Sequence, residues 1–312
     1  MRILTWHVHG SYLQYLSHVP VTWVLPVKPG RPAGYGGRGE TFTWPDTVVE
    51  VDADEVRDAD VDVVLTQSVA NWEHDRHALL GDRVHDLPAV HVEHDPPRGW
   101  PNDALHPVQD ERALLVHVTH FNALMWDSGA TPHAVVEHGV DVPDLPWTGE
   151  RERAVTVVNN LRTRGRRLGP DVFDRVAAQV PVDLAGMGGE GEADWLGDVR
   201  LADLHRLLPS YRCFVNPIRY TSLGLAVCEA MALGLPVVGL ATTEMATAVQ
   251  NGVNGYVETD VDRLAGHVRR LLEDRDEAAE LSRGAKRTAA ERFGIGRFAD
   301  DWLAVLQRAA AG

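Results

Sequence analysis

The chain alternates short, valine-rich apolar runs with helical stretches, and it does so twice along its 312 residues. Strands that alternate with helices favour parallel sheets covered on both faces. In the first half, the runs expected to be strands are residues 2–8, 21–27, 61–67, 88–94, 114–120 and 133–139. In the second half they are residues 154–158, 181–185, 211–215, 235–239 and 255–257. The sequence therefore predicts an α/β protein with two doubly wound parallel-sheet domains.

A proline-rich, charged stretch, VDVPDLPWTGERER, separates the two halves and predicts a domain boundary. We expect domains over residues 1–146 and 147–295, followed by a helix over residues 296–312. Other helices are expected at residues 72–80, 121–127, 170–179, 201–208, 223–233, 261–273 and 276–291. Ligands of such sheets bind outside the carboxyl ends of the strands, so we expect a site in a cleft between the domains.

Charge and composition narrow the class of partner. A net charge of −15 disfavours nucleic acid as a partner. Cys213 and Cys228 lie in apolar runs, so neither a disulfide framework nor a zinc motif is indicated. No window approaches the 18 or so apolar residues of a membrane span, and the N-terminal residues lack the pattern of a signal peptide. We expect a cytoplasmic protein; peripheral membrane contact and the oligomeric state stay open.

A single carboxylate, Glu229, stands in the apolar segment TSLGLAVCEAMALGLPVV (residues 221–238). A buried carboxylate costs several kcal/mol unless it is paired or hydrogen-bonded. Its partner is either a structural arginine or the diol of a ligand. Ser222 is the expected N-cap of the helix, and Gly224 allows backbone to approach a ligand closely. A helix N-terminus with small residues favours an anion such as phosphate.

Four arginines occupy six consecutive positions in the segment NNLRTRGRRLG (residues 159–169). In an acidic protein such a cluster favours an anionic ligand, because guanidinium groups bind phosphate through paired hydrogen bonds. A solvated run of charges is the alternative.

Two further motifs are weaker. GMGGEG (residues 186–191) matches the dinucleotide pattern GxGxxG, but the residues after it do not read as the required helix. The segment VHVEHD places His91, Glu93 and Asp95 on one face of a strand, beside His94. Residues on one face of a strand enclose an ion poorly, so we expect no metal here.

The segment at residues 221–238 resembles the donor-binding signature of the retaining glycosyltransferases of family 4, which have the GT-B architecture. The matching residues are Gly224, Leu225, Glu229, Ala230, Met231, Ala232, Gly234, Pro236, Val237 and Val238. The resemblance implies two Rossmann-like domains facing a cleft, a C-terminal helix that crosses back to the first domain, and ribose binding by Glu229. The family's Glu-Gly-Phe, however, is replaced by Thr221, Ser222 and Leu223. The sugar contact made by that first Glu is therefore altered or lost.

The resemblance implies roles for other segments. Arg162, Arg164 and Arg166 would bind the donor diphosphate, with the backbone of residues 221–225 near sugar or phosphate. Gly186 and Gly188 would border the nucleotide. His94 would lie beside the anomeric carbon of the donor, although a packed histidine is the alternative. His9, Gly10 and Ser11 would form a loop on the acceptor side.

The function that follows is transfer of a sugar from a nucleotide-sugar donor to an acceptor hydroxyl, with retention and without a metal or other cofactor. Two alternatives stay open. The replacement at Thr221 favours a non-catalytic nucleotide-sugar binder or partner subunit, and GMGGEG favours an NAD-dependent oxidoreductase. The residues identify neither the base, nor the sugar, nor the acceptor.

Overall fold

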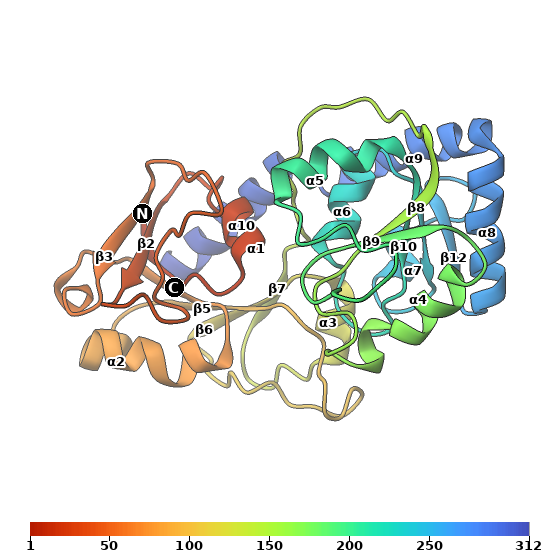
Figure 1. Ribbon diagram of the computed structural model, residues 1–312. Helices are drawn as coiled ribbons and strands as arrows, with labels where there is room; N and C mark the ends of the chain where they lie inside the picture. The colour runs from red at the N-terminus through yellow and green to blue at the C-terminus, as the bar shows by residue number, and fades with distance from the viewer. Residues whose placement is uncertain (312) are drawn as a thin grey trace. The chain divides into compact units, whose positions relative to one another are not determined.

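The computed structural model describes residues 1–311, which form two compact units (Figure 1). The first unit contains Met1–Gly139 and the C-terminal helix α10 (Ile295–Ala311), and the second contains Val140–Gly294. The chain thus leaves the first unit near Gly139 and returns to it at Ile295. In each unit, parallel strands form one sheet.

The first unit has a seven-stranded sheet in the order β3-β2-β1-β4-β5-β6-β7. This is the doubly wound order, in which the chain reverses direction across the sheet between β1 and β4. Its strands are β1 (Arg2–Leu4), β2 (Thr22–Val27), β3 (Val48–Asp52), β4 (Val63–Thr66), β5 (Ala89–Glu93), β6 (Ala113–His117) and β7 (His133–Val135). Its other helices are α1 (Gly10–Leu16), η1 (Val56–Asp58), η2 (Asn71–Asp75), α2 (Arg76–Leu80), η3 (Gly81–His85) and α3 (His120–Met125).

Helix α10 packs on β4, β5 and α1 of the first unit. Phe298, Trp302 and Leu306 lie on one face of the helix and are fully buried, as their helical spacing indicates. Trp302 also donates a hydrogen bond from Nε1 to the Tyr12 hydroxyl at 3.0 Å. A Cβ atom at Gly139 would lie 2.2 Å from Cβ of Phe298, so this glycine is needed where the chain passes the helix.

The second unit has a five-stranded sheet in the order β12-β11-β10-β8-β9. Its strands are β8 (Arg151–Val157), β9 (Val182–Ala185), β10 (Tyr211–Asn216), β11 (Val237–Leu240) and β12 (Gly255–Glu258). Its helices are η4 (Arg166–Leu168), α4 (Pro170–Ala177), α5 (Leu201–Leu207), η5 (Leu208–Ser210), α6 (Leu225–Ala232), α7 (Met245–Ala248), α8 (Val261–Glu273) and α9 (Arg275–Arg292). Helix α4 packs against α8, and α6 packs against α9. Right-handed crossovers place these two pairs on opposite faces of the sheet.

The structure contains several short elements that the sequence did not predict, among them β3, α1 and α7. β3 was not predicted, because it is an edge strand whose residues are mostly half-buried. Helix α1 was predicted as a loop, because it opens with Gly10 and Ser11. α7 has only four residues, too few for a periodic pattern to appear. Within residues 1–311, no helix combines the length and apolar character that crossing a bilayer requires.

Candidate functional site

The order of strands in the second unit marks the carboxyl ends of its central strands as the candidate binding site. From β8 the chain proceeds to β9 on one side and later to β10 on the other. At such a switch point, the loops that follow the two central strands diverge and leave a crevice at their carboxyl ends. Here those loops are residues 158–169 after β8 and residues 217–224 after β10. The arginine cluster and the start of the donor-binding signature therefore flank one switch point.

Backbone hydrogen bonds join these loops to each other and to the loop after β9. The amide of Asn160 donates to the carbonyl of Met187 at 2.7 Å, and the amide of Met187 donates to Asn159 Oδ1 at 2.9 Å. On the other side, the amides of Arg219 and Tyr220 donate to the carbonyl of Arg167 at 2.9 and 3.2 Å. Asn159 and Asn160 thus connect two of the three loops.

Gly186 and Gly188 have positive φ angles of 126° and 71°, and their lack of a side chain lets the loop approach Asn160. A Cβ atom on Gly188 would lie 2.6 Å from Asn160 Oδ1. The next helix after GMGGEG begins only at Leu201. The motif therefore serves loop packing at these strand ends, and it lacks the helix of a dinucleotide-binding fingerprint.

The arginines differ in how far the protein itself engages them. Arg162 makes four hydrogen bonds of 2.6 to 2.7 Å, two to Asp174 and two to Glu192. These bonds, first to Glu192 and then to Asp174, raise its pKa above the usual arginine range. Arg166 donates to Asp171 at 3.1 Å. Arg164 is exposed and has no side-chain partner among residues 1–311. Of the three predicted diphosphate ligands, Arg164 has its charge most available.

Helix α6 begins two residues later than predicted. Gly224 occupies its N-cap position with extended backbone angles, φ −70° and ψ 139°, and no side chain caps the first turn. The prediction of Ser222 as N-cap is therefore wrong. Ser222 and Leu223 are buried and Thr221 is half-buried, all in the connection before the helix. A Cβ atom on Gly224 would meet no other atom within 4 Å, so a ligand has room beside this first turn.

Glu229 projects from α6 into a buried environment and is 4% exposed. His205 of α5, also 4% exposed, places Nε2 at 3.6 Å from Glu229 Oε2. This distance is too long for a hydrogen bond, and Nε2 of His205 makes none within the described residues. His205 is not among the site residues predicted from the sequence. The signal in the sequence was a single histidine next to Leu204 in the helix LADLHRL.

In the first unit, the structure brings His94 together with His9, two residues predicted separately. Their ring centroids are 4.2 Å apart, and the Tyr12 ring contacts His94 edge-on at 4.6 Å. Burial, then the neighbouring His9 and His138, lower the pKa of His94 well below its ordinary value. Its Nε2 atom is buried and makes no hydrogen bond within residues 1–311. His94 is therefore a neutral imidazole with one nitrogen available. Gly10 and Ser11 start helix α1, so the predicted acceptor-side loop is in fact a helix.

Comparisons with known proteins agree with this architecture. Residues 172–274 match the family described as glycosyl transferases group 1. D-inositol 3-phosphate glycosyltransferase 1 of Catenulispora acidiphila is 33% identical over 227 residues, or 59% of this chain. The chain spans about half (54%) of the length of that relative.

Two solved structures match over nearly all of both chains. Anabaena HepE in complex with UDP and glucose has a TM-score of 0.71 and 15% identity, with 99% of this chain and 100% of that chain covered. Sucrose-phosphate synthase from Thermosynechococcus elongatus has a TM-score of 0.70 and 15% identity, with 100% and 99% covered. The chain has the fold of the GT-B glycosyltransferases. Within that fold, the match to the glycosyl transferases group 1 family lies in the second unit, over residues 172–274.

Proposed function

We propose that this protein is a retaining glycosyltransferase that moves a sugar from a nucleotide-sugar donor to an acceptor hydroxyl. The observation that carries the proposal is the group of features at the carboxyl ends of the central strands in the second unit. Three hydrogen-bonded loops, an uncapped helix start and a buried carboxylate all lie at or beside its switch point. A nucleoside diphosphate needs cations and amides for its phosphates and an acceptor pair for its ribose diol, and these strand ends offer all of them.

In this proposal, Glu229 accepts hydrogen bonds from the ribose hydroxyls, and His205 is its neighbour within the protein. Arg164 binds the diphosphate, because its guanidinium is exposed and unpaired within the described chain. Arg162 holds the loop to Asp174 and Glu192. The amides at the start of α6 add a second contact to phosphate or sugar. Guanidinium and amide groups stabilise a departing diphosphate, so the transfer would need no metal.

In this proposal, His94 acts at the reacting end of the donor. A neutral imidazole can accept a hydrogen bond from a sugar hydroxyl or donate one, according to its tautomer. Oxygens of the leaving diphosphate assist deprotonation of the acceptor hydroxyl, which attacks from the same face and preserves the anomeric configuration. HepE, which shares the fold, was solved with UDP and glucose, so UDP-glucose is the first donor to test.

The test is thermal shift and turnover against UDP-, GDP- and dTDP-sugars, with NAD as the comparison ligand. We expect one class of nucleotide sugar to raise the melting temperature and to be hydrolysed or transferred. Stabilisation by NAD alone would reject the proposal.

A second candidate is a nucleotide-sugar binder without activity, favoured by Thr221 in place of a carboxylate. It predicts binding without hydrolysis or transfer. The matched variant Thr221→Glu separates the two functions. If the native chain binds the donor without turnover because of Thr221, the Thr221→Glu variant should gain turnover. If the native chain turns over its donor, the binder is excluded.

A further inference from the structure

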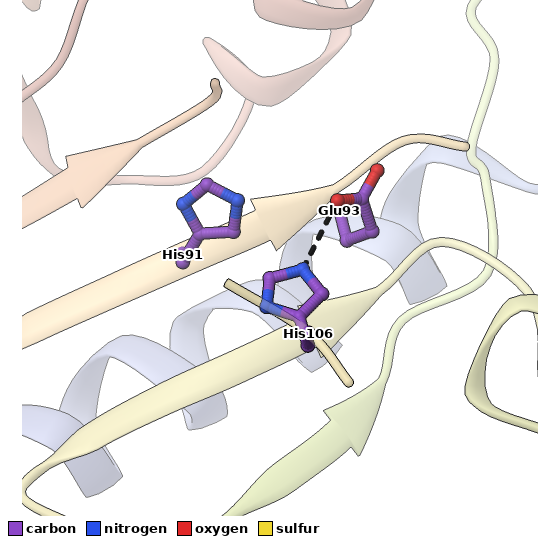
Figure 2. A group of neighbouring side chains, drawn as sticks. All are labelled: His91, Glu93 and His106. Atoms are coloured by element: carbon purple, nitrogen blue, oxygen red, sulfur yellow. Dashed lines mark hydrogen bonds and ion pairs between the residues drawn. The ribbon is translucent and has the colours of Figure 1, made fainter. Parts of the chain in front are cut away.

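A second cluster of polar side chains lies in the first unit, at the carboxyl end of β5. His91 and Glu93 are two residues apart on this strand and therefore share one face. His106, from the connection between β5 and β6, reaches the same place (Figure 2). One ligand atom from each of the three residues lies within 4.8 Å of the other two. The expectation of no metal considered one strand only, and His106 supplies a ligand from outside it.

The cluster is largely buried. His91 is 1% exposed and His106 is 0% exposed, whereas the Glu93 side chain is 16% exposed. Two imidazoles and one carboxylate in such a setting are the donor set that zinc and its neighbours in the transition series prefer. Magnesium and calcium prefer sites built from oxygen atoms alone.

The hydroxyl of Thr66 orients His91 for this role. Thr66 Oγ1 donates to the carbonyl of Val90 at 3.3 Å, and it lies 2.8 Å from Nδ1 of His91. With its own proton used, the hydroxyl accepts the Nδ1 proton of His91. The lone pair is then on Nε2, as in metal sites where an outer partner fixes the tautomer of a ligating histidine.

A hydrogen bond joins the other two residues. The amide of Val108 donates to Nδ1 of His106 at 3.1 Å, so the ring proton is on Nε2. Nε2 in turn lies 3.0 Å from Glu93 Oε2 (Figure 2). A metal ion would take the place of this proton between His106 and Glu93. The proton would move to Nδ1, and the Val108 amide would lose its acceptor.

We propose that His91, Glu93 and His106 form a binding site for one divalent transition-metal ion of the zinc class. The ion links the end of β5 to the connection that carries His106. Its ligand Glu93 directly precedes His94 in the sequence. It is a structural ion and takes no part in sugar transfer. The site thus goes beyond the proposed function, and its test uses no nucleotide sugar.

The experiment is calorimetric titration of the full, untagged chain with Zn²⁺ after dialysis against a chelator, with Co²⁺ absorption as a second readout. We expect one equivalent to bind, with a water molecule as the fourth ligand and a visible Co²⁺ spectrum typical of four-coordinate nitrogen and oxygen ligation. Glu93→Gln and His106→Gln should each weaken binding at least tenfold. His133→Gln is the matched control, since His133 lies on β7 outside the cluster, and it should bind like the native chain.

The amide resonance of Val108 is a second readout that needs no variant, because it is recorded on the native chain. It therefore tests the proposal even if a variant folds poorly. It should shift on addition of one equivalent of Zn²⁺ and stay unchanged with Mg²⁺. The proposal is overturned if no equivalent binds, or if native chain, Glu93→Gln and His133→Gln bind alike. Equal binding would show that Zn²⁺ binds adventitiously to surface histidines.

Discussion

At the scale of single residues, the buried carboxylate of Glu229 gains a neighbour that the sequence did not indicate. The sequence left a structural arginine or a ligand diol as its partner. The structure adds His205, whose Nε2 lies 3.6 Å from Glu229 Oε2, beyond hydrogen-bond length. A side-chain contact between α5 and α6 depends on how both helices pack on the sheet, and no spacing within either helix encodes it.

Glu229→Ala should therefore weaken binding of the donor nucleotide at least tenfold, about 1.4 kcal/mol or more, because two hydrogen bonds to a charged acceptor are lost. Isothermal titration with the best donor measures this. Glu229→Gln, which keeps the shape of the side chain, should be intermediate. Unchanged affinity in a folded Glu229→Ala chain would remove this residue from the site.

His94 should affect turnover more than donor affinity, because the proposal places it beside the reacting carbon. For His94→Gln we expect kcat to fall about tenfold to a hundredfold with little change in the donor KM. Steady-state kinetics at saturating acceptor separates the two constants. Full activity in His94→Gln would make His94 a packing residue of the cluster with His9 and Tyr12.

At the scale of elements, agreement with the sequence follows the strength of local signals. Helix α8 begins and ends where its pattern predicts, because Asp260 caps it by accepting from the amides of Asp262 and Arg263 at 2.9 and 3.3 Å. Helix α6 has no such cap, and its start was misplaced by two residues. The loops after β8, β9 and β10 were recognised as site segments, but the hydrogen bonds that join them were not.

The arginine loop offers a matched pair of variants. Arg164→Ala should lower donor affinity about tenfold without changing the melting temperature, because its side chain is exposed and unpaired in the described chain. Arg162→Ala should lower the free energy of unfolding by about 1 kcal/mol, a modest figure because the paired groups are partly exposed. Titration and urea denaturation distinguish the two effects. A larger loss of donor affinity in Arg162→Ala, at unchanged stability, would reverse the assignment.

At the scale of the whole molecule, the two sheets and their orders follow from the strand–helix alternation and from right-handed crossovers. Buried polar clusters do not, because they gather residues distant in sequence. His117 of β6 is an example. It is fully buried, and neither ring nitrogen has a hydrogen-bond partner in the part of the chain that the structure describes.

Burial, with His106 and His133 nearby, lowers the pKa of His117 to about 3. The unfolded chain takes up this proton below its ordinary pKa of about 6.5, while the folded chain does not. The contribution of His117 to the free energy of unfolding is therefore fully present above pH 6.5. It is lost as the pH falls from 6.5 toward 3. Between pH 7.5 and 5 the loss is about 2 kcal/mol for this group.

Urea unfolding at these two pH values measures the effect. His117→Leu removes the titrating group, so its stability should fall less than that of the native chain by about 2 kcal/mol. His74→Gln, at an exposed histidine, should follow the native chain. Equal losses in native chain and His117→Leu would show that His117 does not contribute.

The central claim is that a nucleotide sugar binds at the switch point of the second unit. Hydrogen–deuterium exchange of the full chain, with and without saturating nucleotide sugar, tests it most directly. We expect slower exchange in residues 158–169, 186–191 and 217–229, and no comparable protection by NAD. Protection by NAD alone, or protection by a nucleotide sugar that spares all three segments, would contradict it.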